Sequence, residues 1–327
     1  MEYRTVGKTG IQVSSLCFGT MSFGGNADAE TSKAMFKRCR EAGINFFDTA
    51  NVYSMGRSEE ILGECIADCR DEIVLASKVY YPTCADINAK GLSRRHIMLE
   101  VENSLRRLKT DRLDFYFVHM FDDHTPMEET LRALDDLQAQ GKILHPAVSN
   151  WAAWQIAKAL GISAKEQLAR FELIQPMYSL VKRQAEVEIL PLAASEQVGV
   201  ISYSPLGAGL LTGKYGVNKR PEQGRLVEEK RYTDRYADET NYVVAERFSA
   251  YAAEHGINPA TLAVAWAMSH PAVTAPIIGA RHVEQLEDSL AAVDVDMTPE
   301  WRDEISSLSA PPQPATDRGE TLLPIWS

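Results

Sequence analysis

Four side chains of the types that carry out proton transfer stand near short apolar runs in the first 120 residues. Asp48, Lys78 and His119 each lie at or near the end of such a run, and Tyr53 follows Asp48 by five residues. Taken singly, each has an ordinary structural explanation, since an aspartate after a strand often caps the next helix and a lysine there is usually solvated. Three neighbouring runs that end in ionisable groups, beside a tyrosine, favour a shared site.

These four residue types suit one kind of chemistry. A free phenol has a pKa of about 10, but a nearby ammonium favours the phenolate and lowers that pKa. Lys78 can supply the ammonium and Asp48 can hold it by a charge-assisted hydrogen bond, although the same pair also makes sense as a purely structural ion pair. A neutral His119 can orient a carbonyl oxygen while Tyr53 protonates it. The set predicts the reduction of a carbonyl group.

The elements that would position these side chains alternate along nearly the whole chain. Eight short apolar runs, rich in β-branched and aromatic residues, alternate with longer amphipathic stretches. The predicted strands span residues 16–20, 45–50, 73–78, 113–119, 143–150, 173–178, 199–204 and 273–279. The predicted helices include residues 30–41, 58–68, 93–107, 126–140, 185–197 and 241–254. Eight parallel strands joined by helices predict an α/β fold, the (β/α)8 TIM barrel, in which the strand ends converge on one face.

An open doubly wound sheet would also alternate strands with helices, but it normally carries a glycine fingerprint after its first strand. The first strand here ends in Phe18-Gly19-Thr20-Met21, without that fingerprint. We therefore predict one domain over residues 1–327, with the barrel at about 15–308. A β-hairpin over residues 3–13 is expected to plug one end of the barrel. The apolar close of the C-terminal tail (309–327) is expected to dock on the barrel or on a neighbour.

The longest irregular segment, residues 207–236, follows the seventh strand. Loops of this length are usually functional or mobile. Its seven basic residues are Lys214, Lys219, Arg220, Arg225, Lys230, Arg231 and Arg235, and four acidic residues nearly balance them, namely Glu222, Glu228, Glu229 and Asp234. Two interpretations stay open: a solvated surface excursion, or a cover for a bound cofactor.

Bulk properties exclude several classes of protein. A content of 45% apolar and 24% charged residues is typical of a folded globular chain. The formal charge of −11 argues against a nucleic-acid partner. No apolar run approaches the roughly 20 residues that span a bilayer, and the N-terminus lacks a secretory signal, so we expect a cytoplasmic protein. The five cysteines are odd in number and are expected to be reduced.

Two other motifs are weak. Residues 208–215 resemble a phosphate loop, but Ala208 replaces the leading glycine and Tyr215 the required Ser or Thr, which argues against nucleotide triphosphate binding. His119 with Asp122, Asp123 and His124 suggests a divalent metal site, as in barrel hydrolases. We instead expect residues 122–124 to cap the helix that starts near 126, and no metal. Trp151 and Trp154, three apart on a helix, are expected to pack in the core.

A series of motifs, in one order from about residue 3 to 308, resembles a known family. The motifs are NFFDTANVY at 45–53, GRSEE at 56–60, LG at 62–63, ASK at 76–78, LDFY at 113–116, VH at 118–119, GKI at 141–143, VSN at 148–150, Gln175, Tyr178, YSPL at 203–206, LLTGKY at 210–215, IGAR at 278–281 and Gln285. They resemble the aldo-keto reductase family, and most closely its bacterial branch whose eighth strand ends in Gly-Ala-Arg.

This resemblance implies the (β/α)8 fold, a nicotinamide cofactor bound without a Rossmann domain, and a catalytic tetrad of Asp48, Tyr53, Lys78 and His119. Ser149, Asn150 and Gln175 would hold the carboxamide, and Tyr203 would stack on the nicotinamide ring. Ser204, Leu206 and Gly209 would contact the pyrophosphate. The other implied cofactor contacts are Gly19, Thr20, Met21, Asp48, Pro205, Lys214, Gly279, Arg281, Gln285 and Ser289.

The predicted cofactor is NADPH, because Arg281 would pair with the 2′-phosphate, which its planar fork suits better than a lysine does. Arg281 also has a structural interpretation, as a residue at a helix start. Ser289 stands where the family pattern usually has asparagine, four residues after the Gln285 position. A serine is shorter, so adenine recognition is expected to be looser.

The main functional prediction is an NADPH-dependent oxidoreductase that reduces aldehydes or ketones, with Tyr53 as the acid. The alternatives are a cofactor-binding, redox-sensing regulatory subunit with little turnover, since the family includes channel-associated subunits, and a metal-dependent barrel hydrolase. The walls of the substrate pocket are expected to come from Met21, Phe23, Tyr53, Tyr80, Met120, Trp151 and Trp326. Their character predicts apolar or aromatic aldehydes over charged sugars. The oligomeric state is not predicted.

Overall fold

The computed structural model describes residues 1–316 and contains a closed barrel of parallel strands. The strands follow one another around the barrel in chain order, and the last closes on the first. They are β3 (Cys17–Gly19), β4 (Phe46–Asp48), β5 (Val74–Val79), β6 (Leu113–Val118), β7 (Ile143–Ser149), β8 (Leu173–Gln175), β9 (Gly199–Ser202) and β10 (Ala275–Ile278). The predicted (β/α)8 barrel is confirmed, although most strands are shorter than predicted.

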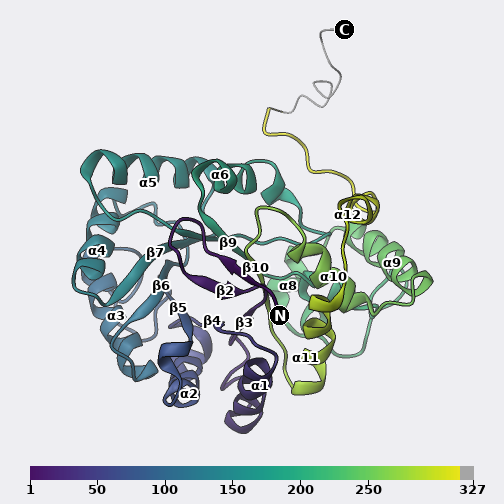
Figure 1. Ribbon diagram of the computed structural model, residues 1–327, viewed down its shortest axis with the longest axis horizontal. Coiled ribbons are helices and arrows are strands. Elements are labelled where there is room, and N and C mark those ends of the chain that lie inside the picture. The colour runs from purple at the N-terminus through teal and green to yellow at the C-terminus, as the bar shows by residue number, and fades with distance from the viewer. Residues whose placement is uncertain (317–327) are drawn as a thin grey trace.

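Helices form a ring outside the strands (Figure 1). The longer ones are α1 (Ala29–Glu41), α2 (Arg57–Ile66), α3 (Arg94–Leu108), α4 (Met127–Ala139), α5 (Ala153–Glu166), α6 (Ile189–Glu196), α9 (Glu239–Glu254), α10 (Pro259–Met268), α11 (Val283–Leu290) and α12 (Pro299–Ser306). Several begin at a polar cap: the side chains of Asp28, Ser93 and Thr298 each accept a hydrogen bond from a backbone N–H in the first turn of their helix.

One helix prediction was wrong, and one segment predicted to be irregular contains helical turns. The expected helix over 185–197 is broken into a 3-10 turn, Gln184–Glu186, and the shorter α6. Pro191 explains the break, because it would clash in a helix interior but is tolerated in the first turn, where α6 places it. The segment 207–236 is also less irregular than predicted, since it contains a 3-10 turn, Gly207–Thr212, and the short helices α7 (Arg225–Glu228) and α8 (Lys230–Arg235).

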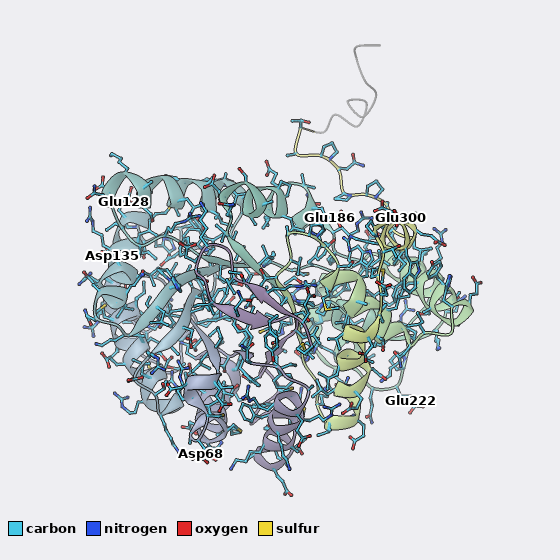
Figure 2. All side chains as sticks on the ribbon, viewed as in Figure 1. Asp68, Glu128, Asp135, Glu186, Glu222 and Glu300 are labelled. Atoms are coloured by element: carbon cyan, nitrogen blue, oxygen red, sulfur yellow. The ribbon has the colours of Figure 1, made fainter. Side chains whose placement is uncertain are left out.

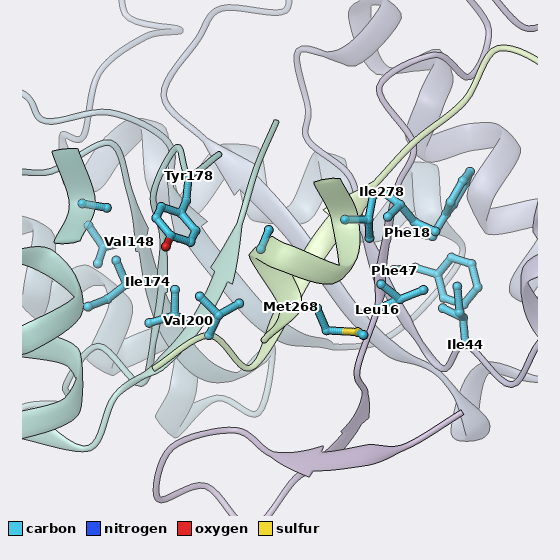
Figure 3. Close-up of a cluster of buried hydrophobic side chains, with 14 of the residues drawn as sticks. Leu16, Phe18, Ile44, Phe47, Val148, Ile174, Tyr178, Val200, Met268 and Ile278 are labelled. Atoms are coloured by element: carbon cyan, nitrogen blue, oxygen red, sulfur yellow. The ribbon is translucent and has the colours of Figure 1, made fainter. Parts of the chain in front are cut away.

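The barrel interior is a packed core made by every second residue of the strands. The buried side chains that fill it are Val6, Val13, Cys17, Phe46, Val74, Ala76, Phe115, Phe117, Ala147, Leu173, Ile201 and Ala275. The intervening residues point outward and form a second, larger core under the helices, of which Figure 3 shows Leu16, Phe18, Phe47, Val148 and Ile174. The strands are therefore apolar on both faces, as expected of parallel strands between a core and helices.

The N-terminal hairpin closes the end of the barrel where the strands begin. Strands β1 (Tyr3–Thr5) and β2 (Gln12–Ser14) pair antiparallel and lie across the barrel in the foreground of Figure 1. Val6 and Val13 insert into the interior core. Gly7 lies so close to α6 that an added Cβ would be 2.7 Å from the carbonyl oxygen of Gln197. The predicted plug is confirmed.

Several further expectations can be compared with the structure. Trp151 is buried as expected. Trp154 is 61% exposed, so the prediction that it packs in the core was wrong. Acidic residues such as Asp68, Glu128, Glu222 and Glu300 lie at the periphery (Figure 2). Within residues 1–316, no helix is both long and apolar enough to cross a membrane. The apolar close of the tail, with Trp326, lies outside the described residues.

Candidate active site

The predicted tetrad lies at the C-terminal ends of the strands because its members continue the inward-facing alternation. Asp48 lies two residues beyond Phe46, Lys78 two beyond Ala76 and His119 two beyond Phe117, and all three earlier residues belong to the interior core. Since side chains alternate with a period of two, the next inward positions lie at the barrel mouth. Ser149, Gln175 and Tyr203 reach the mouth in the same way, two residues after Ala147, Leu173 and Ile201.

Lys78 is the centre of the tetrad and is fully buried. Its Nζ donates to Asp48 Oδ2 at 2.6 Å, to the Thr49 carbonyl oxygen at 2.8 Å and to Tyr53 Oη at 3.2 Å. An ammonium has three donors, so these acceptors satisfy it completely. Burial by itself lowers the pKa of Lys78, but the charge of Asp48 and the contact with Tyr53 more than offset burial and raise the pKa. Lys78 is therefore a charged ammonium.

Tyr53 accepts from Lys78, so its own hydroxyl proton remains available to another acceptor. The ring meets that of His119 edge to face, with centroids 6.1 Å apart. Ser54 and Met55, the next two residues, both have positive φ, 49° and 54°, and Ser54 Oγ donates to the Phe23 carbonyl oxygen at 2.8 Å. Left-handed backbone at two successive non-glycine residues is strained and is often found at functional sites.

The prediction that Lys78 lowers the pKa of Tyr53 below its ordinary value was wrong in its net direction. Burial raises the pKa of Tyr53 by more than the Lys78 ammonium lowers it, and the Asp48 charge adds to the rise. A phenol buried in a site of low polarity ionises less readily, even beside a cation. Tyr53 is consequently a protonated phenol at neutral pH.

His119 has a neutral imidazole. Burial, followed by repulsion from Lys78, lowers the pKa of His119 well below its ordinary value. Its Nδ1 is buried and has no hydrogen-bond partner among the described residues. The ring of Tyr81 also meets the imidazole edge to face, with centroids 5.2 Å apart. His119 can therefore offer a hydrogen bond to a ligand at the mouth without bringing a second cation beside Lys78.

A chain of hydrogen bonds links the tetrad to the predicted nicotinamide residues. Gln175 Nε2 donates to Asp48 Oδ1 at 2.9 Å, and Ser149 Oγ donates to the Gln175 carbonyl oxygen at 3.0 Å. Asn150 Nδ2 donates to Ser149 Oγ and to the His119 carbonyl oxygen, both at 3.0 Å. Tyr203 Oη donates to Asn150 Oδ1 at 2.8 Å. The structure thus brings all of these residues together.

The residues predicted near the phosphates lie in tight backbone turns beside this chain. Ser204, Ala208, Gly209 and Gly213 all have positive φ, between 57° and 103°. Pro205 is buried and Leu206 caps the 3-10 turn Gly207–Thr212, which Lys214 follows. Gly19 and Gly279 approach closely, because an added Cβ on Gly279 would be 3.3 Å from the Gly19 carbonyl oxygen. Met21 Sδ lies 4.0 Å from Tyr232 Oη.

Other predicted cofactor residues lie just after β3 and at or within α11. Thr20 Oγ1 is engaged with the Asp48 carbonyl oxygen and with Ser58 Oγ. Arg281 and Gln285 lie at the start of α11, where the Arg281 N–H donates to Gln285 Oε1 at 2.9 Å. Ser289 is 2% exposed and lies on the buried face of that helix, apart from the tetrad.

Several aromatic side chains pack together around the mouth. The sequence did not identify them as a cluster. Phe121 packs edge to face on Trp151, with centroids 4.9 Å apart, and lies 6.3 Å from Trp154. Tyr80 and Tyr81 pack on each other at 5.0 Å. The prediction that Phe23 lines the substrate pocket was wrong, because this side chain is fully buried against Phe18. Tyr81 could have been found from its place three residues after Lys78, but Phe121 had no distinctive signal.

The basic residues of segment 207–236 include a cluster at its second half. The guanidiniums of Arg225, Arg231 and Arg235 lie 4.8 to 5.2 Å from the ring centre of Tyr232. Tyr232 is buried, and its hydroxyl faces Met21. This segment therefore lies against the mouth rather than projecting from the molecule as a solvated loop.

The metal hypothesis finds no support. Within residues 1–316, no three His, Cys, Asp or Glu side chains converge as metal ligands. The predicted role of Asp122 as a cap for α4 was wrong, since the cap residue is Pro126, without a side-chain hydrogen bond. Asp122 instead accepts from the N–H groups of Leu92 and His124 and from Thr125 Oγ1, which ties two loops together. The five cysteines in the described part of the chain are unpaired.

Known proteins match this chain over almost its full length. The model of the Aldo/keto reductase family matches residues 15–310. The uncharacterized oxidoreductase YrpG of Bacillus subtilis (strain 168) is 37% identical over 316 residues, which cover 92% of this chain and 93% of that protein. A probable voltage-gated potassium channel subunit beta of Arabidopsis thaliana is 36% identical over 329 residues, 97% of this chain and 100% of that protein.

A similar potassium channel subunit beta of Oryza sativa subsp. japonica, also described as probable, is 36% identical over 317 residues, 94% of this chain and 96% of that protein. The family match covers the barrel and every member of the tetrad. The chain therefore belongs to the aldo/keto reductase family, a family of oxidoreductases.

Proposed function

We propose that this protein reduces an aldehyde or ketone to an alcohol with NADPH as the reductant and Tyr53 as the proton donor. The observation that carries the proposal is the hydrogen bond from Lys78 Nζ to Tyr53 Oη at 3.2 Å, which leaves the phenolic proton free for a substrate oxygen. Bound NADPH supplies a hydride to the carbonyl carbon. The side chains around the mouth account for the accompanying proton.

Proton transfer from Tyr53 leaves a phenolate, which the adjacent Lys78 ammonium stabilises. Asp48 keeps the ammonium charged and correctly placed through its contact of 2.6 Å. Neutral His119 donates to the carbonyl oxygen and aligns it for Tyr53, because a positioned donor is worth more in a site that excludes water. Each group thus acts in the protonation state that its surroundings favour.

The residues around the mouth fit a nicotinamide dinucleotide. Asn150, Gln175 and Ser149 are amides and a hydroxyl already fixed in one hydrogen-bonded chain, which is suited to a carboxamide. Ala208, Gly209 and Gly213 form left-handed turns of the kind whose backbone N–H groups bind phosphate oxygens, although the Gly209 N–H itself donates to the Leu206 carbonyl oxygen at 3.0 Å. Arg281 would hold the 2′-phosphate. In a chain of net charge −11, a basic cluster beside these turns supports an anionic ligand there.

Tyr53→Phe tests the proposal. It removes the transferable proton and keeps the ring, so turnover should fall by about 10²- to 10⁴-fold while the Kd for NADPH changes by less than about twofold. Turnover is followed as NADPH oxidation over a panel of carbonyl substrates, with NADH in parallel, and the Kd by fluorescence titration. Turnover that survives the substitution would reject Tyr53 as the acid.

A second candidate is a regulatory subunit that binds the cofactor and turns it over slowly. The potassium channel subunits beta that match more than nine tenths of the chain favour it. The complete tetrad favours catalysis, because a pure scaffold has no need for a buried ammonium. NADPH quenching without oxidation by any carbonyl in the panel would support the regulatory function.

Aromatic rings at the mouth support apolar or aromatic aldehydes as the substrate class. Tyr81 is 36% exposed and Trp154 61%, and Phe121 packs against both Trp151 and Trp154. Charged sugars would have to be desolvated against these rings. Sugars that outperform aromatic aldehydes in the panel would contradict this assignment. The free thiols fit the cytoplasmic location that we propose.

A further inference from the structure

The guanidinium of Arg281 pairs with an acidic residue of the protein itself. Arg281 Nη2 lies 3.2 Å from Glu228 Oε2, although the two residues are 53 positions apart in sequence. Within residues 1–316, Glu228 is the one acidic side chain within 4 Å of this guanidinium. Arg281 lies just before α11, which is labelled next to α1 in Figure 1, and Glu228 is the last residue of α7.

Packing positions the backbone on both sides of this pair. The turn that leads into α7 presses on Tyr215, since an added Cβ on Gly224 would be 2.6 Å from Tyr215 Oη. Leu226 is 4% exposed, and Thr233 Oγ1 donates to its carbonyl oxygen at 2.7 Å. On the other side, the Arg281 backbone is held by Gln285. The packing of the segment therefore brings the backbones of Glu228 and Arg281 close together, while their side chains remain partly exposed.

From this geometry we infer that Glu228 competes with the 2′-phosphate of the cofactor for Arg281 and so sets the preference between NADPH and NADH. The inference rests on the proposed function, in which Arg281 receives that phosphate. A carboxylate and a phosphate both bind a guanidinium through the same N–H donors. A 2′-phosphate at Arg281 would place two like charges side by side, so phosphate binding is penalised unless Glu228 turns away.

Glu228 is able to turn away at little cost. The Arg281 side chain is 33% exposed and that of Glu228 43%, and such ion pairs contribute little. Glu228 ends a helix of four residues, and the next residue, Glu229, has extended backbone. The effect is therefore a modest penalty on NADPH that does not apply to NADH, which has no 2′-phosphate. Because the pair is partly solvated, added salt should reduce the penalty.

The test measures dinucleotide affinity on the full chain without substrate. Glu228→Gln keeps the shape of the side chain and removes its charge. The matched control is Glu229→Gln, which removes the same charge one residue away, where the carboxylate pairs with Arg231 at 3.2 Å and not with Arg281. The Kd values for NADPH and NADH are determined by calorimetric titration for the wild type and for both variants, at low and at high salt.

We expect Glu228→Gln to tighten NADPH binding by about two- to fivefold and to change NADH binding by less than about 1.5-fold, with a smaller effect at high salt. Glu229→Gln should leave the ratio of the two Kd values unchanged. Weaker NADPH binding by Glu228→Gln would mean that Glu228 fastens the segment over the cofactor, which overturns the inference. An equal change for both dinucleotides, or the same change in the control, overturns it as well.

Failure of the proposed function would look different. The wild type could bind neither dinucleotide, or the wild type and Arg281→Ala could both bind NADPH and NADH equally well. Either result would mean that Arg281 does not bind the 2′-phosphate, and it would overturn the inference together with the choice of NADPH. A wild type that prefers NADPH and loses the preference in Arg281→Ala, but shows no effect of Glu228→Gln, overturns the inference alone.

Discussion

At the scale of single residues, a fully buried ammonium is the least ordinary feature of this protein. Lys78 has no exposed surface, and its charge is balanced by one carboxylate, Asp48, which is itself 2% exposed. Taking such a pair out of water is costly, and burial is repaid only when every donor has a good acceptor. Lys78 meets that condition with three acceptors, one of which is the phenol that it serves.

Asp48→Asn should show how far the ammonium depends on the carboxylate. The amide keeps the size of the side chain but leaves Lys78 as an uncompensated buried charge, so the free energy of unfolding at pH 7 should fall by about 3 kcal/mol, and carbonyl reduction should be lost. Denaturation in guanidinium chloride with a linear extrapolation measures the change.

The double variant Asp48→Asn with Lys78→Met provides the control. Removing the charge as well should restore more than half of the lost stability while the protein stays inactive, because methionine fills the same space without a charge. If the free energy of unfolding of Asp48→Asn lies within about 1 kcal/mol of the wild-type value, Lys78 does not need Asp48 for its burial.

At the scale of elements, the site depends on how the helices hold their strands in register. Helix α2 follows the strained turn of Tyr53, and it packs so closely on the end of α3 that Gly63 admits no side chain. An added Cβ there would lie 2.7 Å from the backbone carbonyl group of Leu108 and from the Arg107 carbonyl oxygen. Beside this contact, Arg107 pairs with buried Glu59 at 2.6 Å.

Gly63→Ala should therefore lower the free energy of unfolding by about 2 kcal/mol, because rigid backbone cannot yield to the new methyl group. Gly161→Ala is the matched control on α5, where nothing lies within 4 Å of the added Cβ. Alanine is the better helix former, so this change should stabilise by about 0.5 to 1 kcal/mol. Chemical denaturation of both variants decides the point, and a neutral or stabilising Gly63→Ala would contradict the packing argument.

At the scale of the whole molecule, four histidines are held in their neutral form. Burial is the main cause that lowers the pKa of His96, His119, His145 and His270, and for His270 the value falls to about 4, with Arg302 as a second cause. In the unfolded chain each would bind a proton near pH 6.5. As the pH falls through 6.5, the unfolded state therefore takes up more protons than the folded state does. The free energy of unfolding decreases as a result.

Wild-type stability should accordingly decrease between pH 7.5 and pH 5. Glu59 and Glu172 act in the opposite sense, because burial raises the pKa of each, so the total is smaller than the sum over the histidines. His270→Asn isolates one histidine, since an amide oxygen can accept the Ala272 N–H in place of Nδ1. The loss between the two pH values should be about 2 kcal/mol smaller in the variant than in the wild type. Equal losses in both proteins would contradict a neutral His270.

Much of this molecule could be predicted from local patterns. The eight apolar runs predicted the barrel, and the position of Asp48, Lys78 and His119 at the ends of successive runs predicted that these side chains gather at its mouth. These predictions succeed because strand periodicity and the parallel order of the strands are local rules, which act in the same way in any barrel. The sequence alone determined the architecture and predicted the four side chains that gather at the barrel mouth.

The tertiary structure decided what depends on neighbours that are distant in the chain. The pKa of Tyr53 rises because surrounding elements bury it, and no spacing of residues states how deeply a phenol will lie. The aromatic cluster of Phe121 and Trp151, and the pairing of Glu228 with Arg281 across 53 residues, arise where separate loops meet. Burial and long-range contact are sums over the whole fold, which is why a sequence pattern indicates the side chains that gather at the barrel mouth but not their protonation states or their distant partners.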